Sequence, residues 1–287
     1  MTEALIRYPR LFASLVKFEH TIFALPFAYI GAFLAVDGVP SAHDLLWITI
    51  AMVGARSLAM ALNRLIDAGI DARNPRTAGR ELPRGALEPW QVVVFAAGSL
   101  VVFLIAVYQL SPLVRWLWPI PVAAFVVYPY LKRWSWLSHF WLGAVDGLAP
   151  LGAWAAITNE LPWEVWALGG AVALWVAGFD LLYALFDLDV DREQGLHSMP
   201  ARFGIEAAFR GARLCHVGTV ALLAAAGLGL PVGFLYWVGV AGVAALLVYE
   251  HSLISPRDRR RLDLAFFTMN GVISVTLFAF VLLDSIL

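Results

Sequence analysis

The sequence predicts an all-α fold in which nine transmembrane helices form a polytopic membrane bundle. Composition is the first support, because 61% of the 287 residues are hydrophobic and 14% are charged, with a mean hydropathy of +0.77. Soluble domains average about 45–50% apolar and about 25% charged residues, and a chain of this size has too little interior to hide the excess. The length of the apolar segments and the placement of Lys and Arg are the other two observations.

The apolar segments have the length of about 20 residues that a helix needs to cross a bilayer. We place them, in chain order, at 14–36, 45–67, 90–109, 113–130, 138–158, 164–186, 207–228, 231–250 and 265–286. Residues 21–36 resemble the core of a cleaved signal peptide. However, Glu19 and His20 precede them and further apolar segments follow, so we expect the first segment to stay in the membrane.

The fourth segment is short and contains Pro119, Pro121 and Pro129. Neighbouring helices can satisfy the backbone groups that proline frees, so we still expect it to span. The nine segments predict a single transmembrane domain over 1–287, with pseudo-repeat halves at about 1–135 and 136–287.

Lys and Arg residues are concentrated in alternate loops. They are Arg7 and Arg10 before the first segment, Arg73, Arg76, Arg80 and Arg84 after the second, Lys132 and Arg133 after the fourth, Arg192 and Arg202 after the sixth, and Arg257, Arg259, Arg260 and Arg261 after the eighth. The opposite loops contribute Arg115 alone. Because positive residues accumulate in cytoplasmic loops, the basic loops and the amino terminus are predicted to be cytoplasmic, with Leu287 outside.

A polar cluster ends the second segment, within the stretch NRLIDAGID. Asn63, Asp67 and Asp71 follow one another in steps of four residues. Each step advances about 40° round an α-helix and about 6 Å along it, so one face presents an amide and two carboxylates at the cytoplasmic rim. Asp187 and Asp191 repeat the pattern after the sixth segment, on the same side of the membrane. We therefore expect the two clusters to converge across one cavity.

Oxygen ligands grouped in this way suit Mg²⁺, which takes one or two carboxylates and completes its shell with water and substrate phosphate. Nearby cations can hold the same phosphate, and they are Arg76, Arg80, Lys132, Arg133 and Arg202. Carboxylates alone indicate an ion path, whereas carboxylates with arginines indicate a metal-bridged phosphate. The simpler alternative is a pair of solvated helix ends, and the match between two clusters on one side argues against it.

Three charges lie deeper in the predicted membrane region. Arg56 is seven residues before Asn63, hence on nearly the same helix face and about 10 Å deeper, and Asp180 has the same relation to Asp187. Asp146 falls about two turns inside the fifth segment. Buried ionisable residues face a cavity or one another. Either Arg56 forms an ion pair with Asp146 or Asp180 that locks the bundle, or it clamps an anionic substrate group such as an aromatic carboxylate.

Four stretches match a known set of motifs in the same order. NRLIDAGID is similar to N-D-x-x-D-x-x-x-D, and RTAGRELPRG to R-T-x-x-R-x-L-P-x-G. YPYLKR resembles the end of a fourth helix, and YALFDLDVDREQGLHS a second aspartate motif. These are the motifs of the UbiA superfamily of intramembrane aromatic prenyltransferases, which the chain resembles over essentially its whole length, including the nine-helix count.

The resemblance implies an enzyme, a polyprenyltransferase with its active-site cavity on the cytoplasmic side of the inner (plasma) membrane. It would move a polyprenyl group from polyprenyl diphosphate to a hydroxylated aromatic acid in menaquinone or ubiquinone synthesis, by electrophilic aromatic substitution. The residues implied to hold Mg²⁺ are Asn63, Asp67, Asp71, Asp187 and Asp191. Those implied to bind substrates are Arg56, Arg76, Arg80, Tyr128, Lys132, Arg133, Asp146, Asp180, Tyr183, His197, Ser198 and Arg202. Lys17 and His20 are further candidates for the border of the site.

Two residues depart from the family pattern. Arg64 stands where the first motif has a second-position Asp, and His197 stands where many 4-hydroxybenzoate enzymes have Lys before Ser198. The GLHSMPARFG version looks most like bacterial members in menaquinone synthesis by the futalosine route. There the acceptor is 1,4-dihydroxy-6-naphthoate rather than 4-hydroxybenzoate, so both acids are candidates.

Other classes fit the sequence less well. An ion-coupled transporter is expected to have broken helices and sites near the bilayer centre, whereas the densest polar groups here lie at one rim beside basic loops. A phosphatidyltransferase carries an aspartate signature, with paired Asp-Gly and Ala-Arg, that this chain does not reproduce. Within the superfamily, haem O, chlorophyll and lipid ether synthases are alternatives. Nothing indicates a nucleic-acid partner.

Overall fold

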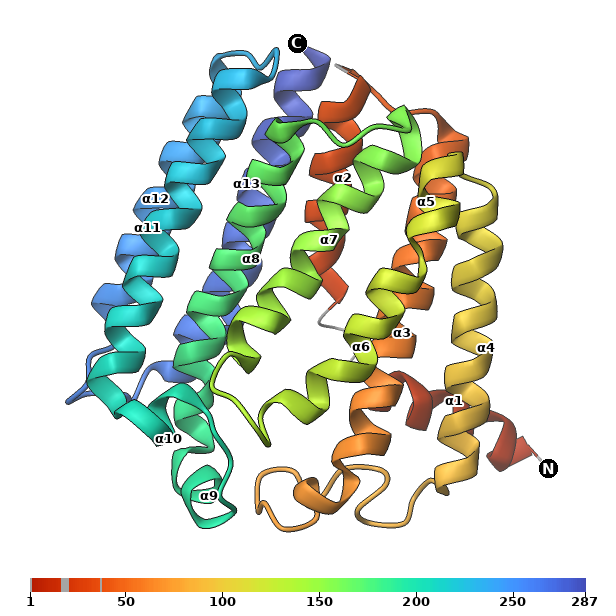
Figure 1. Cartoon of the computed structure of the whole chain (residues 1–287), viewed down its shortest axis with the longest axis vertical. Helices are drawn as coiled ribbons and strands as arrows, with labels where there is room; N and C mark the ends of the chain where they lie inside the picture. The colour runs from red at the N-terminus through yellow and green to blue at the C-terminus, as the bar shows by residue number, and fades with distance from the viewer. Residues whose placement is uncertain (1, 17–20, 37) are drawn as a thin grey trace.

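A computed structural model describes residues 2–16, 21–36 and 38–287, and this part of the chain is built from α-helices without strands (Figure 1). The long helices run side by side between the two ends of the molecule. They are α2 (Thr21–Val36), α3 (Ala42–Asp71), α4 (Pro89–Tyr108), α7 (Ser138–Thr158), α8 (Trp163–Tyr183), α11 (Ile205–Gly229), α12 (Phe234–Leu253) and α13 (Asn270–Ile286).

Shorter helices complete the chain. They are α1 (Thr2–Leu15), α5 (Pro112–Leu117), α6 (Pro119–Leu131), a 3₁₀ turn η2 (Ala184–Phe186), α9 (Leu188–Glu193), α10 (Met199–Phe203) and a π-helical turn η3 (Leu264–Met269). Because α5 and α6 are separated by Trp118 alone, they follow one another as a single span over Pro112–Leu131. The proline-containing fourth segment is therefore long enough to span, as predicted.

Seven helices of the described residues are long and apolar enough to cross a membrane. The first and last predicted segments also form apolar helices, but the stretches Leu25–Val36 and Asn270–Ile286 are shorter than the other spans. The all-α membrane fold is confirmed, whereas the count of nine full spans is not. The outward surface is apolar as a lipid-facing surface requires, with Trp116 83% exposed and Leu228 79% exposed.

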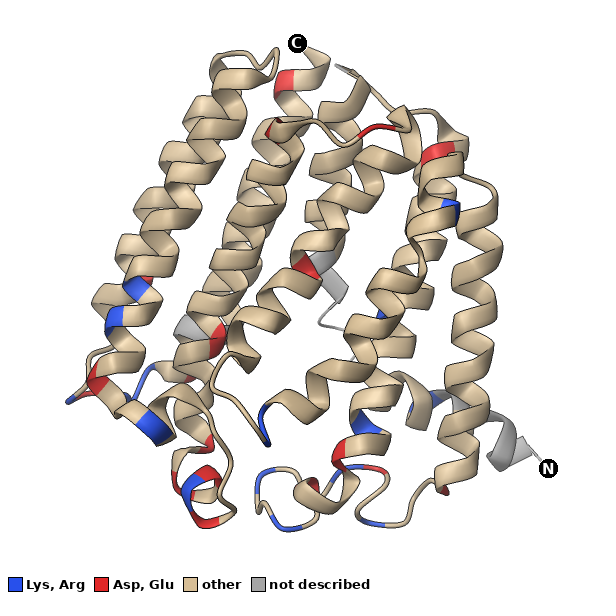
Figure 2. Cartoon of the chain, viewed as in Figure 1, with Lys and Arg blue, Asp and Glu red and all other residues tan. Residues whose placement is uncertain are grey.

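The basic loops lie together at one end of the bundle. Figure 2 shows Lys and Arg gathered at the end that holds α9 and α10, whereas the opposite end is almost free of them. The loop over residues 72–88, which follows α3, lies at the same basic end (Figure 1). The charge asymmetry along the sequence is therefore an asymmetry in space.

Helices α7 and α8 pack with their backbones close together. A Cβ atom added at Gly143 would lie 2.1 Å from the carbonyl oxygen of Ala173, and one at Gly147 would lie 2.5 Å from that of Gly169. Small residues one turn apart permit this approach between membrane helices. The contact sets the register of the two helix ends nearest α9 and α10, which border the polar cavity described below.

We expect Gly143→Ala to lower the apparent thermal midpoint of the detergent-solubilised protein by several degrees, because overpacking costs about 1–3 kcal/mol. Gly152→Ala is the matched control in the same helix, since nothing lies within 4 Å of its added Cβ. Circular dichroism of both variants measures the difference. Equal midpoints for the two variants would show that the backbones of α7 and α8 do not meet closely at Gly143.

Candidate active site

The two acidic clusters lie on helices of different construction. Helix α3 continues without a break through Asp67 to Asp71. By contrast, α8 ends at Tyr183, three residues before the predicted end, and η2 leads to Asp187, the N-cap of α9. The Asp187 side chain makes no capping hydrogen bond to α9. The backbone N–H of Asp191 donates to the Asp187 carbonyl oxygen at 2.7 Å, so the two aspartates remain one helical turn apart on a separate short helix.

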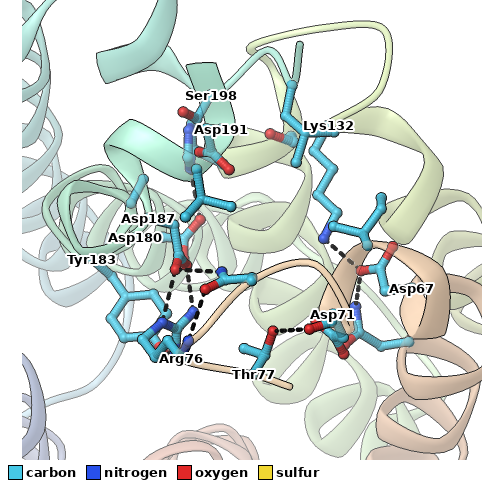
Figure 3. A pocket seen from close by; sticks show the side chains of 18 of the residues that line it. Asp67, Asp71, Arg76, Thr77, Lys132, Asp180, Tyr183, Asp187, Asp191 and Ser198 are labelled. Atoms are coloured by element: carbon cyan, nitrogen blue, oxygen red, sulfur yellow. Dashed lines mark hydrogen bonds and ion pairs between the residues drawn. The ribbon is translucent and has the colours of Figure 1, made fainter. Parts of the chain in front are cut away.

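A polar cavity of about 160 Å³ lies between the clusters (Figure 3). The predicted site residues that line it are Asn63, Asp67, Asp71, Arg76, Arg80, Tyr128, Lys132, Asp180, Tyr183, Asp187, Asp191 and Ser198. One wall comes from α3 and the loop after it, and the other from α8, η2 and α9. Residues more than 100 positions apart in sequence therefore face one another, as the matched clusters predict.

Asp67 is 1% exposed and lies at the centre of the first cluster. Lys132 at the end of α6 places its Nζ 2.6 Å from the Asp67 Oδ2, and Arg133 places an Nη2 3.4 Å from Oδ1. The Asn63 side-chain N–H also donates to Oδ2 at 3.2 Å. A buried carboxylate needs such partners to offset the loss of water.

Asp71 holds the loop that follows α3. Arg80 Nη1 lies 2.7 Å from both carboxylate oxygens of Asp71, and Thr77 donates its hydroxyl to the Asp71 carbonyl oxygen at 3.0 Å. These contacts fold the loop back over the end of α3. The loop thereby carries Arg76 and Arg80 to the mouth of the cavity.

Arg76 joins the loop to the second cluster. Its Nε donates to Asp187 Oδ1 at 2.8 Å, its Nη2 pairs with Oδ2, and its Nη1 donates to the Tyr183 hydroxyl at 2.7 Å. Asn74 donates to the same Asp187 Oδ1 at 2.8 Å. Burial alone would raise the pKa of Asp187, but the hydrogen bonds from Arg76 and Asn74 outweigh it and lower that pKa. Burial raises the pKa of Asp191, and the nearby Asp187 carboxylate adds to the rise.

Three aspartates of this cavity are paired with cations: Asp67 with Lys132, Asp71 with Arg80 and Asp187 with Arg76. Figure 3 shows Arg76 reaching Asp187 on one side and Lys132 reaching Asp67 on the other. A divalent cation bound by the aspartates, together with a diphosphate bound by the Arg and Lys, would replace each ion pair without leaving a buried charge unpaired. The cavity is thus suited to a metal and a phosphate that arrive together.

The donor set fits Mg²⁺ that shares a phosphate ligand. Among the described residues, no three His, Cys, Asp or Glu side chains form a group that would hold a metal without other ligands. Each wall instead offers carboxylates one turn apart. Mg²⁺ usually takes one or two carboxylates and completes its shell with water and substrate phosphate.

Other predicted residues do not line this cavity. Arg202 is exposed and stacks on Phe203, with its guanidinium 5.5 Å from the ring centroid. His197 donates its backbone N–H to the Lys132 carbonyl oxygen at 2.8 Å, and its buried ring Nδ1 has no partner. Arg133 donates to the Ile66 carbonyl oxygen at 2.6 Å. The structure therefore does not show direct diphosphate contacts from His197 and Arg202, because neither residue is part of the cavity lining.

Arg56 and Asp146 lie outside the cavity lining, farther along α3 and α7. They interact electrostatically, yet Arg56 forms no ion pair with any described carboxylate, and its buried Nε has no hydrogen-bond partner. The alternative in which Arg56 locks the bundle by an ion pair with Asp146 or Asp180 is not observed. A guanidinium whose buried Nε has no hydrogen-bond acceptor among the described residues favours the clamp.

The family departure at Arg64 leaves the cavity intact. Arg64 is 5% exposed and donates its Nε to the carbonyl oxygen of Leu15 at the end of α1, at 3.3 Å. The side chain therefore anchors α1 instead of entering the site. Lys17 and His20, the candidates for the border of the site, lie outside the described residues.

Several lining residues were missed at the sequence level. They are Asn74, Thr77, Ser138 and His139, with the apolar Ile70, Ala184, Val190 and Leu196. Asn74 lies beyond the end of α3 and contacts its partner Asp187 across the cavity. A Ser-His pair at the start of an apolar segment was the available signal for Ser138 and His139, because polar side chains in a predicted span tend to face a cavity.

Residues 24–272 match the model of the UbiA prenyltransferase family. The chain belongs to the UbiA prenyltransferase family. A 4-hydroxybenzoate octaprenyltransferase of Nitrosospira multiformis is 35% identical over 258 residues, which cover 88% of this chain and 87% of the relative. One from Aliivibrio fischeri is 32% identical over 98% of this chain and 96% of its own length.

Solved structures give the same family. The apo structure of a UbiA homologue from Aeropyrum pernix K1 superposes with a TM-score of 0.83 at 32% identity, over 93% of this chain and 98% of that one. A UbiA homologue from Archaeoglobus fulgidus bound to DMAPP and Mg²⁺ has a TM-score of 0.75 at 19% identity, over 95% and 98%. This second likeness shows the fold alone. The motif resemblance is confirmed, and this UbiA-family chain is a prenyltransferase with a multi-span membrane fold.

Proposed function

We propose that this UbiA-family enzyme transfers a polyprenyl group from polyprenyl diphosphate to a hydroxylated aromatic acid, in an Mg²⁺-dependent step of quinone synthesis. One observation carries the proposal: both aspartate clusters and the cations Arg76, Arg80 and Lys132 line the same cavity. A site needs both metal ligands and phosphate-binding cations only where it holds an anionic group and then releases it. The Mg²⁺ and prenyl diphosphate of the Archaeoglobus homologue agree with this assignment.

The reaction follows from the charges of the cavity. When bound, Mg²⁺ supplies positive charge to the diphosphate oxygens of the donor. Arg76 and Lys132 exchange their aspartate partners for the diphosphate and neutralise it as the C–O bond breaks. Tyr128 and Tyr183 line the cavity, where ring faces stabilise the resulting allylic cation. An electron-rich ring carbon of the acceptor then attacks that cation.

The acceptor is proposed to be 4-hydroxybenzoate or 1,4-dihydroxy-6-naphthoate. The first is supported by the names of the relatives, and the second by the GLHSMPARFG stretch. Both acids carry a carboxylate that the unpaired Nε of Arg56 would bind. The ring would then lie between Arg56 and the diphosphate site.

Product analysis tests the function. The purified enzyme receives geranyl diphosphate, Mg²⁺ and each acid in turn, and mass spectrometry detects the prenylated acid. A product that depends on Mg²⁺ and forms with one acid identifies the acceptor. Product from neither acid would contradict the proposal and favour another UbiA-type acceptor, such as a haem or lipid precursor.

We expect Arg56→Ala to raise the KM of the aromatic acid about 10- to 100-fold, from the roughly 1.5–3 kcal/mol of a hydrogen bond to a charged group. The donor KM should change little, because Arg56 does not line the diphosphate cavity. Steady-state kinetics with both substrates measures the split.

Arg115→Ala is the control for this variant. Arg115 lies in α5, on the side of the membrane predicted to be opposite the basic loops, and donates to the Leu110 carbonyl oxygen. It should leave both KM values unchanged. A loss of folded protein on changing Arg56 alone would identify a structural role instead of a clamp.

We also propose that the protein lies in the inner (plasma) membrane with its basic end in the cytoplasm. The positive-inside rule supports this orientation, given the gathered Lys and Arg residues at one end (Figure 2). The halves 1–135 and 136–287 would each contribute one aspartate cluster, in keeping with a pseudo-repeat. Soluble diphosphate product would then leave on the cytoplasmic side.

A further inference from the structure

A histidine–aspartate pair in the cavity wall has no part in the steps above. Asp180 lies in the last turn of α8, and His139 is the second residue of α7. Both line the cavity, and His139 Nδ1 lies 2.7 Å from Asp180 Oδ2. The α7–α8 contact through small residues holds the two helix ends at this separation.

The hydrogen bonds of His139 determine its tautomer. The backbone N–H of Met199 donates to His139 Nε2 at 3.1 Å, so Nε2 carries no proton. A neutral imidazole has one N–H, which is therefore on Nδ1 and donates to Asp180. His139 is 4% exposed and is fixed on both ring nitrogens. The pair therefore consists of the Asp180 carboxylate and a neutral His139 imidazole that donates a hydrogen bond to it.

Among the described residues, Asp180 has no cationic partner, unlike most carboxylates of the cavity. Within the described part of the chain, no Lys or Arg lies within ion-pair distance of it. Its partner is the neutral imidazole of His139, so the carboxylate is not held by an adjacent cation. Asp191 is also without such a pair, but it stands at the rim with Asp187. The ion-paired carboxylates are Asp67 with Lys132, Asp71 with Arg80 and Asp187 with Arg76.

We propose that Asp180 is the base that removes the ring proton after prenyl transfer, and that His139 is a positioning residue that holds it. This inference rests on the proposed function. Asp180 lies within α8, seven residues before Asp187, and Asp146 interacts with both Arg56 and Asp180. The carboxylate is therefore on the membrane side of the diphosphate, where a ring held by Arg56 would lie.

Removal of the ring proton completes the substitution. The C–O bond of the donor breaks, and its electron pair leaves with the diphosphate. A ring π pair forms the new C–C bond. The ring is then cationic, and the attacked carbon still carries its hydrogen. The electrons of that C–H bond return to the ring, and its proton goes to the Asp180 carboxylate. The proton passes to water when the product leaves.

The test is the hydrogen isotope effect on the acceptor. Asp180→Asn keeps an oxygen that accepts from His139 but takes up no proton, so kcat should fall about 10²–10⁴-fold, the usual contribution of a general base. Geranyl diphosphate, Mg²⁺ and the acid that the wild type prenylates are used, with the acid in ring-protonated and ring-deuterated forms. We expect a primary isotope effect in the variant and none in the wild type, because proton loss becomes rate-limiting only in the variant.

Glu250→Gln is the matched control. Glu250 is 1% exposed on α12 and lies outside the cavity, so the variant makes the same carboxylate-to-amide change at another buried position. It should keep the wild-type kcat and show no isotope effect. A thermal shift with geranyl diphosphate and Mg²⁺ verifies that each variant still folds and binds the donor.

His139 is tested by its own pair of variants. His139→Leu removes the donor to Asp180. It should lower kcat, and the primary isotope effect should appear. His139→Asn retains a side-chain N–H near the position of Nδ1 and should recover part of the rate. If Asp180→Asn does not fold, His139→Leu gives the same isotope readout.

The outcomes separate the two proposals. A wild type that prenylates neither acid overturns the proposed function and, with it, this inference. A productive wild type whose Asp180→Asn variant keeps its rate and shows no isotope effect overturns only the inference. A loss confined to donor binding, again without an isotope effect, also overturns it and gives the pair a structural role.

Discussion

Asp67→Ala and Asp187→Ala should each reduce turnover with geranyl diphosphate and Mg²⁺ by about 10²–10³-fold or more, the scale seen when a preorganised electrostatic group is removed from an active site. Each variant removes, from one wall of the cavity, the carboxylate with the most hydrogen-bond and ion-pair partners. The bundle should stay folded, because the freed cations Lys132 and Arg76 have side chains 31% and 35% exposed and regain water. Product formation and far-UV circular dichroism measure the two properties.

Asp189→Ala is the control for these variants. Asp189 lies in α9 between Asp187 and Asp191, but it is exposed and does not line the cavity. Its removal should leave turnover near the wild-type value. Near-normal product from Asp67→Ala or Asp187→Ala would exclude the metal assignment.

Lys132→Ala should lower kcat by about 10²–10³-fold, since a positioned cation at a departing diphosphate acts on the transition state. A second effect follows from its 2.6 Å contact with Asp67. Without the lysine, Asp67 has lost the cation that competes with a metal. The Mg²⁺ concentration for half-maximal rate should therefore fall while kcat also falls. A magnesium titration of the steady-state rate separates the two effects.

Arg133→Ala is the neighbouring control. Arg133 does not line the cavity, and its shortest contact is with the Ile66 carbonyl oxygen, so we expect a loss of less than about tenfold. Equal losses of kcat at both positions would show that the overall positive charge supports the rate, and not a positioned cation at Lys132. An unchanged Mg²⁺ requirement in Lys132→Ala would show that the lysine does not compete with the metal.

The architecture of this protein follows from local features of the sequence. Apolar runs of membrane-spanning length predicted the helices, and the alternation of basic loops predicted that both aspartate clusters lie at one end. The four-residue steps of Asn63, Asp67 and Asp71 fall on one face because the α-helix repeats every 3.6 residues. Each of these inferences needs only residues within one helix or loop.

The contacts of the site depend on how distant helices are rotated and packed. Spacing along the chain did not reveal that Asn74 binds Asp187, that His139 holds Asp180, or that α8 ends early at Tyr183. It also did not reveal that Arg64, His197 and Arg202 lie outside the cavity lining. A helical period determines which residues share a face of one helix. Packing between helices, such as the glycine contact of α7 with α8, decides which residue lies opposite that face. This information is present only in the tertiary structure.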